Sequence, residues 1–254
     1  MRWRSREGEK ATALGDEEGI ILGDPVGGHF ALFDLAQRGD TIRGSSQSSE
    51  LPASQGQGIF AASNSSIALG KRFLRETHPI WWFGTGGNPG PFIYRLVGRY
   101  LAVSDYTDYR RKLATHAWTR VPVPLASGTF AGVFSLAFRD EEHGIAVGGD
   151  YKKPNESTGT AAWTADGGKT WTRAEKPPHG YRSAVAWDAD GKAWIAVGTN
   201  GSDVSYDDGK RWSPLDKGNW NALSLPWVVG PDGRIAKLGT LRPTESKRKV
   251  TAKK

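Results

Sequence analysis

Residues 164–171 read TADGGKTW, and the carboxylate of Asp166 is the group of this stretch that could take part in catalysis or metal binding. Beside two glycines in a loop, a carboxylate could act as a catalytic acid, bind a metal ion or close a tight turn. A second copy, SYDDGKRW, spans 205–212 and has Asp207 in the equivalent place. Because a single catalytic acid would not recur in the same setting, the repetition favours a structural turn over catalysis.

Both stretches follow the Asp-box pattern: Ser or Thr, any residue, Asp, any residue, Gly, any residue, Thr, aromatic. The first copy fills every fixed position, and in the second Arg211 replaces the Thr. Glycine supplies a positive φ, the carboxylate accepts hydrogen bonds from nearby backbone N–H groups, and the Trp ring can be buried. The predicted structural turn residues are Thr164, Asp166, Gly168, Thr170, Trp171, Ser205, Asp207, Gly209 and Trp212.

The segments around these turns repeat as strand, turn, strand, Gly-rich loop, strand, Asp-Gly turn, strand. Trp171 and Trp212 lie about 41 residues apart, which is the length of one four-stranded propeller blade. The apolar strand followed by a Gly-rich break recurs at 16–25, 79–87, 140–150 and 193–201. Shorter strands are predicted at 58–63, 132–138 and 181–187, a partial unit at 228–238, and degenerate turns at 35–42 and 111–118. The sequence therefore predicts an all-β fold, a β-propeller of four-stranded blades.

Composition agrees with many short strands and excludes several kinds of site. The 254 residues include 33 Gly and 11 Trp but no Cys, so disulfides, thiolate metal sites and a cysteine nucleophile are excluded. The five His residues show no metal-ligand spacing. We therefore expect no metal and no cofactor. No run of about 18 apolar residues is present, so we expect no transmembrane segment.

The net charge of +7 is concentrated at the two ends of the chain. Residues 1–10 carry four basic and two acidic side chains, and residues 241–254 carry six basic and one acidic, so the body between them is about neutral. We predict a poorly ordered basic start (1–14), a propeller domain (15–240) and a disordered basic tail (241–254). A nucleic-acid-binding domain would carry its basic face on the folded body, so no nucleic-acid partner is expected. The alternative is a tail that binds an anionic partner.

With these motifs, the chain resembles the sialidase-related Asp-box (BNR) propellers. It is most similar to the photosystem II stability and assembly factor family and its bacterial relatives outside photosynthesis. The resemblance covers about residues 15–240 and is strongest over 130–236. It implies a seven-bladed propeller exported to the lumen or periplasm. It also implies a protein partner, which for the photosynthetic members is a membrane protein.

The chain departs from that family in length and in where its repeats begin. Seven blades of about 41 residues need nearly 290 residues, whereas about four to six blades are accounted for here. The sequence also starts within a repeat, without the apolar core of a signal peptide. We expect either one or two further blades and an export signal before residue 1, or a smaller ring, or pairing with another copy. If the start is genuine, the sequence indicates a cytoplasmic protein.

Strands alternate in direction along a blade, so the Asp-Gly turns lie on the face opposite the long Gly-rich loops. Binding residues concentrate on variable loops held by a rigid scaffold. The candidate partner-binding residues are Asp24, Asp150, Tyr151, His179, Tyr181, Arg182 and Asn200. The alternative is that they are ordinary turn residues.

We therefore expect a non-catalytic scaffold or assembly factor that binds a protein through one face, with no catalytic residue assigned. The first alternative is a sialidase-type glycoside hydrolase, which needs a Tyr nucleophile and several Arg residues around the substrate carboxylate. Tyr181 and Arg182 are the best such pair, and no Arg-Ile-Pro start motif is present. Some bacterial relatives are labelled oxidoreductases, a chemistry for which this sequence offers no residues.

Overall fold

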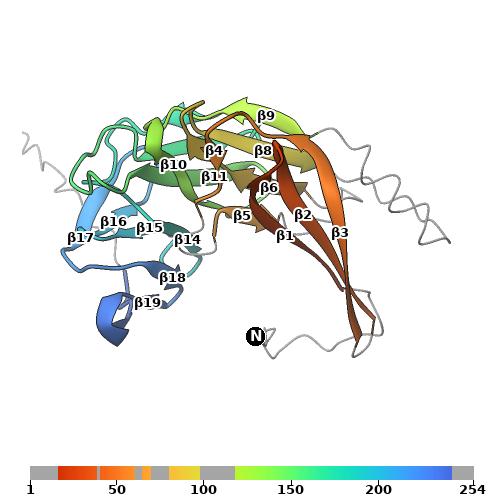
Figure 1. Ribbon diagram of the computed structural model, residues 1–254. Helices are drawn as coiled ribbons and strands as arrows, with labels where there is room; N and C mark the ends of the chain where they lie inside the picture. The colour runs from red at the N-terminus through yellow and green to blue at the C-terminus, as the bar shows by residue number, and fades with distance from the viewer. Residues whose placement is uncertain (1–16, 39–40, 61–64, 70–79, 98–117, 242–254) are drawn as a thin grey trace, which may run out of the picture. The chain divides into compact units, whose positions relative to one another are not determined.

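The computed structural model describes residues 17–38, 41–60, 65–69, 80–97 and 118–241 (Figure 1). Within these ranges every regular element is a β-strand, apart from one 3-10 turn, η1 (Pro231–Gly233). The named strands pair in antiparallel sheets, which confirms the prediction of an all-β fold. None of the sheets closes on itself in the part of the chain that is described.

The residues up to Ala53 form one compact unit. Its described part is a sheet of three long strands in chain order, β1 (Glu17–Val26), β2 (His29–Arg38) and β3 (Thr41–Pro52). The degenerate turn predicted at 35–42 falls at the junction between β2 and β3, although residues 39–40 lie outside the described residues.

The junction between β1 and β2 is tighter than the sequence predicts. GDPVGG (23–28) is predicted as a Gly-rich loop, but β1 continues to Val26 and the turn consists of Gly27 and Gly28, at φ of 61° and 83°. The register of β1 shifts between Gly23 and Pro25. Such an irregularity accommodates proline, which has no N–H to donate to the ladder. The prediction of a long loop here is therefore wrong.

The residues from Ser54 onward form a second compact unit, which contains four sheets among the described residues. One sheet has the order β5-β6-β8-β9, with β5 (Ile67–Leu69), β6 (Ile80–Gly84), β8 (Phe92–Val97) and β9 (Thr119–Pro122). The next has the order β13-β12-β11-β10-β7-β4, with β4 (Gln57–Gly58), β7 (Gly86–Gly87), β10 (Gly128–Phe138), β11 (His143–Asp150), β12 (Ala161–Ala165) and β13 (Thr172–Arg173). The last two contain β14 (Ala184–Asp188), β15 (Ala193–Gly198), β16 (Gly201–Ser205) and β17 (Ser213–Asp216), then β18 (Ala222–Ser224), β19 (Trp227–Val229) and β20 (Ile235–Lys237).

The strand order predicted from the repeat is present twice. Strands β10 to β13 follow one another as antiparallel neighbours, and strands β14 to β17 do the same. In both sets the third and fourth strands are joined by one of the two Asp-Gly turns. The hairpin predicted at 228–238 is also present, as β19 and β20, and β18 precedes it in the same sheet.

The Gly-rich segment 84–90 does more than connect two strands. Within it, β7 pairs with β10 on one side and with β4 on the other, so the sheet has six strands where four are predicted. A Cβ on Gly86 would lie 2.5 Å from the carbonyl oxygen of Ala131, and one on Gly132 would lie 2.4 Å from the Cα of Gly86. Two glycines therefore allow this close approach of backbones. The strand predicted at 58–63 is only Gln57–Gly58 in the described part.

Apolar side chains form one cluster between each pair of successive sheets. Trp82, Ile93 and Val133 pack between the β5–β9 sheet and the β10 sheet. Ile145, Trp194 and Trp212 pack between the β10 sheet and the β14–β17 sheet. A third cluster joins the β14–β17 sheet to β18–β20, and its members include Ile195, Val204, Leu223 and Val228. The sheets of this unit therefore stack face to face in chain order.

The ends of the chain lie mostly outside the described residues, as does the predicted turn at 111–118 except for Trp118. Leu241, the first residue of the predicted tail, packs against the third cluster. Among the residues described, no helix has the length and hydropathy that crossing a membrane would require.

Candidate functional site

The Asp-Gly turn at 164–171 is closed by the carboxylate of Asp166. Its Oδ1 accepts hydrogen bonds from the backbone N–H groups of Lys169 and Thr170, both at 3.0 Å, and from the Thr164 hydroxyl at 2.8 Å. Its Oδ2 accepts the Thr170 hydroxyl at 2.6 Å. The Thr164 hydroxyl oxygen in turn accepts the Gly168 N–H at 3.0 Å, with Gly168 at φ 80°.

The turn at 205–212 has the same arrangement. The Ser205 hydroxyl donates to Oδ1 of Asp207 at 2.9 Å and accepts the Gly209 N–H at 3.0 Å. The same carboxylate oxygen accepts the N–H of Arg211 at 2.9 Å. In each turn the carboxylate bonds to groups of its own turn, an arrangement that holds backbone in place rather than presenting a reactive oxygen.

These turns also contact the preceding sheet, which the sequence motif does not predict. The indole N–H of Trp82 and Nε of Arg95 donate to the carbonyl oxygen of Gly167 at 3.0 and 2.9 Å. In the second Asp-Gly turn, Oδ1 of Asp208 accepts a hydrogen bond from Nε of Arg139 at 2.8 Å. Each Asp-Gly turn is therefore bonded to an arginine in, or directly after, a strand of the sheet stacked before it.

Replacing Asp166 by alanine should lower the free energy of unfolding by about 1 kcal/mol, as for the loss of a helix cap. The exposed turn lets water replace part of the lost hydrogen bonding. Burial raises the pKa of Asp166, but the hydrogen bonds from Thr170, Thr164 and Lys169 outweigh it and leave the pKa below its usual value. A depressed pKa stabilises the fold above the carboxyl's unfolded pKa of about 3.9, and that contribution disappears as the pH falls through the lower folded value.

Urea unfolding at pH 7 and at pH 2.5 measures this effect, with Asp190→Ala in the exposed turn at 189–192 as the matched control. The difference between Asp166→Ala and the wild-type chain should shrink at pH 2.5. A difference that stays the same at both pH values would contradict the assigned role of the carboxylate.

The seven predicted binding residues fall into three groups. Asp24 is exposed and lies within strand β1 of the first unit, so its prediction as a loop residue is wrong. Asp150 ends β11 and Tyr151 follows it. The remaining four converge around one buried carboxylate that the sequence did not single out, Asp203 of β16; they are His179, Tyr181, Arg182 and Asn200.

Arg182 is fully buried and pairs with Asp203. Its Nε donates to Oδ2 of Asp203 at 2.8 Å, and its Nη2 reaches the same oxygen. Its Nη1 donates to the carbonyl oxygen of Tyr181 and to Oδ1 of Asn200, both at 2.6 Å. Burial lowers the pKa of Arg182 from its ordinary value, and the charge of Asp203 opposes that change. The Arg182–Asp203 ion pair is therefore buried and structural.

His179 completes this cluster at its more exposed side. Its Nδ1 lies 2.9 Å from Oδ1 of Asp203 and 2.9 Å from Nη2 of Arg182. Its Nε2 lies 3.1 Å from the carbonyl oxygen of Asn200. The ring is therefore contacted at both nitrogens, and Nδ1 either donates to Asp203 or accepts from Arg182, according to the tautomer.

The predicted surface role of Tyr181 and Arg182 is wrong, because both side chains are buried. Burial is also the main cause that raises the pKa of Tyr181, whereas an activated phenolate nucleophile needs a lower one. The Arg182 guanidinium already pairs with Asp203, so this Tyr/Arg pair does not form the open carboxylate-binding site that a sialidase requires.

The buried cluster holds the long loop at 151–160. The Asn200 amide Nδ2 donates to the carbonyl oxygen of Pro154 at 2.9 Å and to Oδ1 of Asn155 at 3.1 Å. The backbone N–H of Tyr181 also donates to the Pro154 carbonyl, at 3.0 Å. Asn200 and the backbone of Tyr181 therefore hold the 151–160 loop in place by hydrogen bonds to Pro154.

Two aromatic side chains are exposed to solvent near the start of this loop. Phe130 and Tyr151 are 44% and 39% exposed, and their rings meet edge to face with centroids 5.5 Å apart. Nζ of Lys152 lies 5.7 and 5.2 Å from the two ring centroids. We call Phe130, Tyr151 and Lys152 the Tyr151 patch. The buried ring of Phe134 supports it, 6.1 Å from Tyr151 and 4.8 Å from Tyr181.

Sequence reasoning identified Tyr151 but missed Asp203, Phe130 and Lys152. A lone Asp within the strand SDVS of β16 was a usable signal, since a charge inside a buried strand needs a partner. Phe130 carried no such signal, because it lies among residues of a strand that is otherwise largely buried.

No protein-family model matches the chain, and no curated protein matches it significantly. In the described ranges no three His, Asp or Glu side chains converge as a metal site would require.

Proposed function

We propose that this protein is a non-catalytic propeller of the Asp-box type that binds a protein partner through the Tyr151 patch. Two observations support the fold part of the proposal: the repeated four-strand order with an Asp-Gly turn between the third and fourth strands, and the face-to-face stacking of successive sheets. The resemblance to the photosystem II assembly factor family favours a scaffold or assembly role.

The observation that carries the binding part is the exposure of two touching aromatic rings beside a lysine. Aromatic side chains dominate the binding energy of protein interfaces because they bury a large area at a small cost in conformational entropy. The Phe130 and Tyr151 rings offer such an area, and Lys152 adds a charge that can pair with a partner.

The support beneath the patch fits the same function. A loop that is held in place before binding loses less entropy when a partner docks. The Asp150 carboxylate accepts the N–H of Lys152 at 2.9 Å, and Asn200 ties the loop at Pro154. Asp150 and Asn200 thus act as positioning residues for the patch, not as contacts.

Affinity purification of a tagged wild-type chain from its source cells, compared with Tyr151→Ala, tests this proposal. A protein that is enriched only by the wild-type chain is then purified and titrated against both. Loss of a hot-spot ring costs about 2 kcal/mol, so we expect about 30-fold weaker binding by Tyr151→Ala with an unchanged melting temperature.

The matched control is Tyr206→Ala, since Tyr206 is 40% exposed in the second Asp-Gly turn. Equal binding by wild type and Tyr151→Ala would contradict the assignment of the patch. Turnover of a fluorogenic sialoside by the wild-type chain would contradict the non-catalytic function and favour the glycoside hydrolase alternative.

A further inference from the structure

The Tyr151 patch combines an apolar surface with a positive charge. Phe130 and Tyr151 expose their rings to solvent, and Nζ of Lys152 lies over both of them, 5.7 and 5.2 Å from the ring centroids. The next residue, Lys153, is exposed as well. An ammonium group has three N–H donors and no acceptor, so it can rest on an aromatic face and still donate to an anion.

Neither lysine is neutralised by a carboxylate of the described part of the chain. None of the ion pairs found there includes Lys152 or Lys153. The carboxylate of Asp150, two residues before Lys152, accepts the backbone N–H of Lys152 at 2.9 Å instead. Both positive charges therefore stand at the surface beside the two rings without a counter-charge from the described residues.

The rest of the chain does not carry the complementary charge. The four longer stretches outside the described residues are 1–16, 70–79, 98–117 and 242–254, and each contains more basic than acidic residues. A second copy bound patch to patch would bring the lysines of both copies together, where like charges repel. Charge complementarity therefore favours an acidic partner over a segment of this chain or a symmetric dimer.

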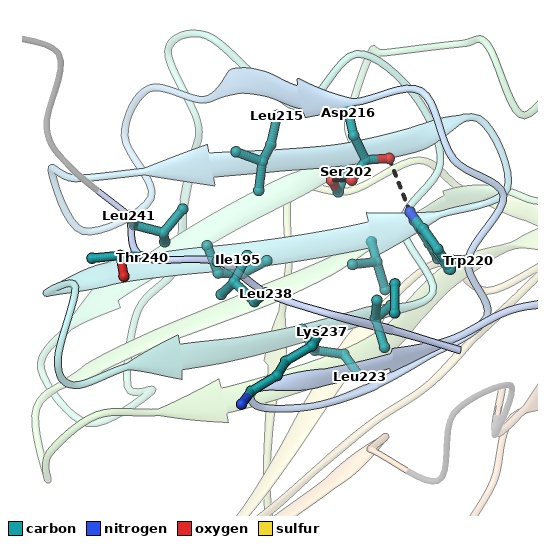
Figure 2. Close-up of a pocket in the computed structure, with 14 residues that line it drawn as sticks. Ile195, Ser202, Leu215, Asp216, Trp220, Leu223, Lys237, Leu238, Thr240 and Leu241 are labelled. Atoms are coloured by element: carbon teal, nitrogen blue, oxygen red, sulfur yellow. Dashed lines mark hydrogen bonds between the residues drawn. The ribbon is translucent and has the colours of Figure 1, made fainter. Parts of the chain in front are cut away.

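A cavity of about 320 Å³ between the β14–β17 sheet and the last sheet offers no comparable selectivity (Figure 2). Its lining is mainly aliphatic and includes Ile195 and Leu223. Its carboxylate, on Asp216, accepts the indole N–H of Trp220 at 2.9 Å (Figure 2). An aliphatic lining accepts any apolar group of suitable size, whereas the Tyr151 patch also distinguishes partners by charge.

We infer, on the basis of the proposed protein-binding function, that the partner binds the Tyr151 patch through an acidic segment. A carboxylate of that segment pairs with Lys152, and a neighbouring apolar side chain packs against the Phe130 and Tyr151 rings. Exposed ion pairs are weak and are screened by salt, so charges of this kind select a partner more than they add affinity. The rings therefore supply most of the binding energy, and the lysines select the acidic sequence.

Titration of the wild-type chain with two blocked peptides, followed by NMR, tests the inference. The acidic probe is acetyl-Ser-Glu-Leu-Glu-Phe-Ser-amide, and the neutral probe has Gln in place of both Glu residues. At low salt we expect saturable binding of the acidic probe, about threefold tighter than that of the neutral probe. Salt at roughly 0.5 M should remove this difference. Lys152→Gln should also remove it, and Lys152→Glu should reverse it.

Lys169→Glu is the matched control and should bind both probes like the wild-type chain, because Lys169 is an exposed lysine of the first Asp-Gly turn. Absence of saturable binding of the acidic probe by the wild-type chain would overturn the inference. Equal binding of the two probes at low salt, weakened by Tyr151→Ala, would overturn the acidic preference and leave the proposed function in place.

Two other occupants of the patch are tested in the same way. Binding of a thymidine oligonucleotide that Tyr151→Ala weakens would assign the patch to single-stranded nucleic acid, which also stacks on aromatic rings beside basic residues. Concentration-dependent dimers in sedimentation that the acidic probe dissociates would assign it to a second copy. Either result would overturn the choice of an acidic protein partner.

Discussion

Replacing Asp203 by alanine is expected to lower the free energy of unfolding by about 3–5 kcal/mol, because it leaves the Arg182 guanidinium buried without its counter-charge. The side chains of Arg182 and Asp203 are 0% and 1% exposed, so water cannot compensate for the lost partner. The same change removes the carboxylate oxygen that lies 2.9 Å from Nδ1 of His179. Urea unfolding at pH 7, followed by tryptophan fluorescence, measures the loss.

The double variant Arg182→Leu with Asp203→Leu separates the buried charge from the packing of the site. Removing both charges together should recover most of the stability, since well-packed apolar residues often replace a buried ion pair without loss. Hydrogen exchange should show faster opening of the 151–160 loop in Asp203→Ala. A loss below about 1 kcal/mol for Asp203→Ala would mean that Arg182 finds another partner or reaches solvent.

Replacing Trp212 by alanine is expected to cost about 3–5 kcal/mol, as for other fully buried tryptophans. Its side chain is 1% exposed between two stacked sheets, where it packs with Ile145 and Trp194. Its indole N–H also donates to the Gly209 carbonyl at 2.9 Å and so ties the second Asp-Gly turn to the core. The midpoint of urea unfolding reports the change.

Trp227→Ala is the matched control, because Trp227 is 51% exposed on β19 and should cost less than about 1 kcal/mol. Similar losses for the two variants would show that Trp212 does not join the two sheets. A large loss for Trp212→Ala together with a smaller denaturant slope would instead indicate that the stacked sheets no longer unfold together.

Much of the fold of the second unit could be predicted from the sequence, because its signals are local. Alternating apolar residues with Gly-rich breaks located β10 to β12 and β14 to β16, and the Asp-Gly motif located the turns to β13 and β17. A turn of that kind depends on a carboxylate and a positive-φ glycine within a few residues of each other, and both can be read from the chain.

The candidate site was predicted only in part. Tyr151 was identified as a loop residue and is exposed, whereas Arg182 was expected at the surface and is buried. The sequence PPHGYRS (177–183) is typical of a turn, but it does not indicate which other segments of the chain pack over that turn. The burial of Arg182 could therefore not be predicted from it. Arg182 pairs inside the protein with Asp203, which lies 21 residues further along the chain on strand β16.

The sequence alone determined most strands of the β10–β13 and β14–β17 sets, where the Asp-Gly turns close, and that no thiol chemistry is available. Only the tertiary structure decided that Arg182 pairs inside with Asp203, that Phe130 joins Tyr151 at the surface, and that a cavity lies between the β14–β17 sheet and the last sheet. The physical reason is the range of the interactions. Strand periodicity and turn geometry are fixed by near neighbours, whereas burial, ion pairing and cavities depend on residues that only folding brings together.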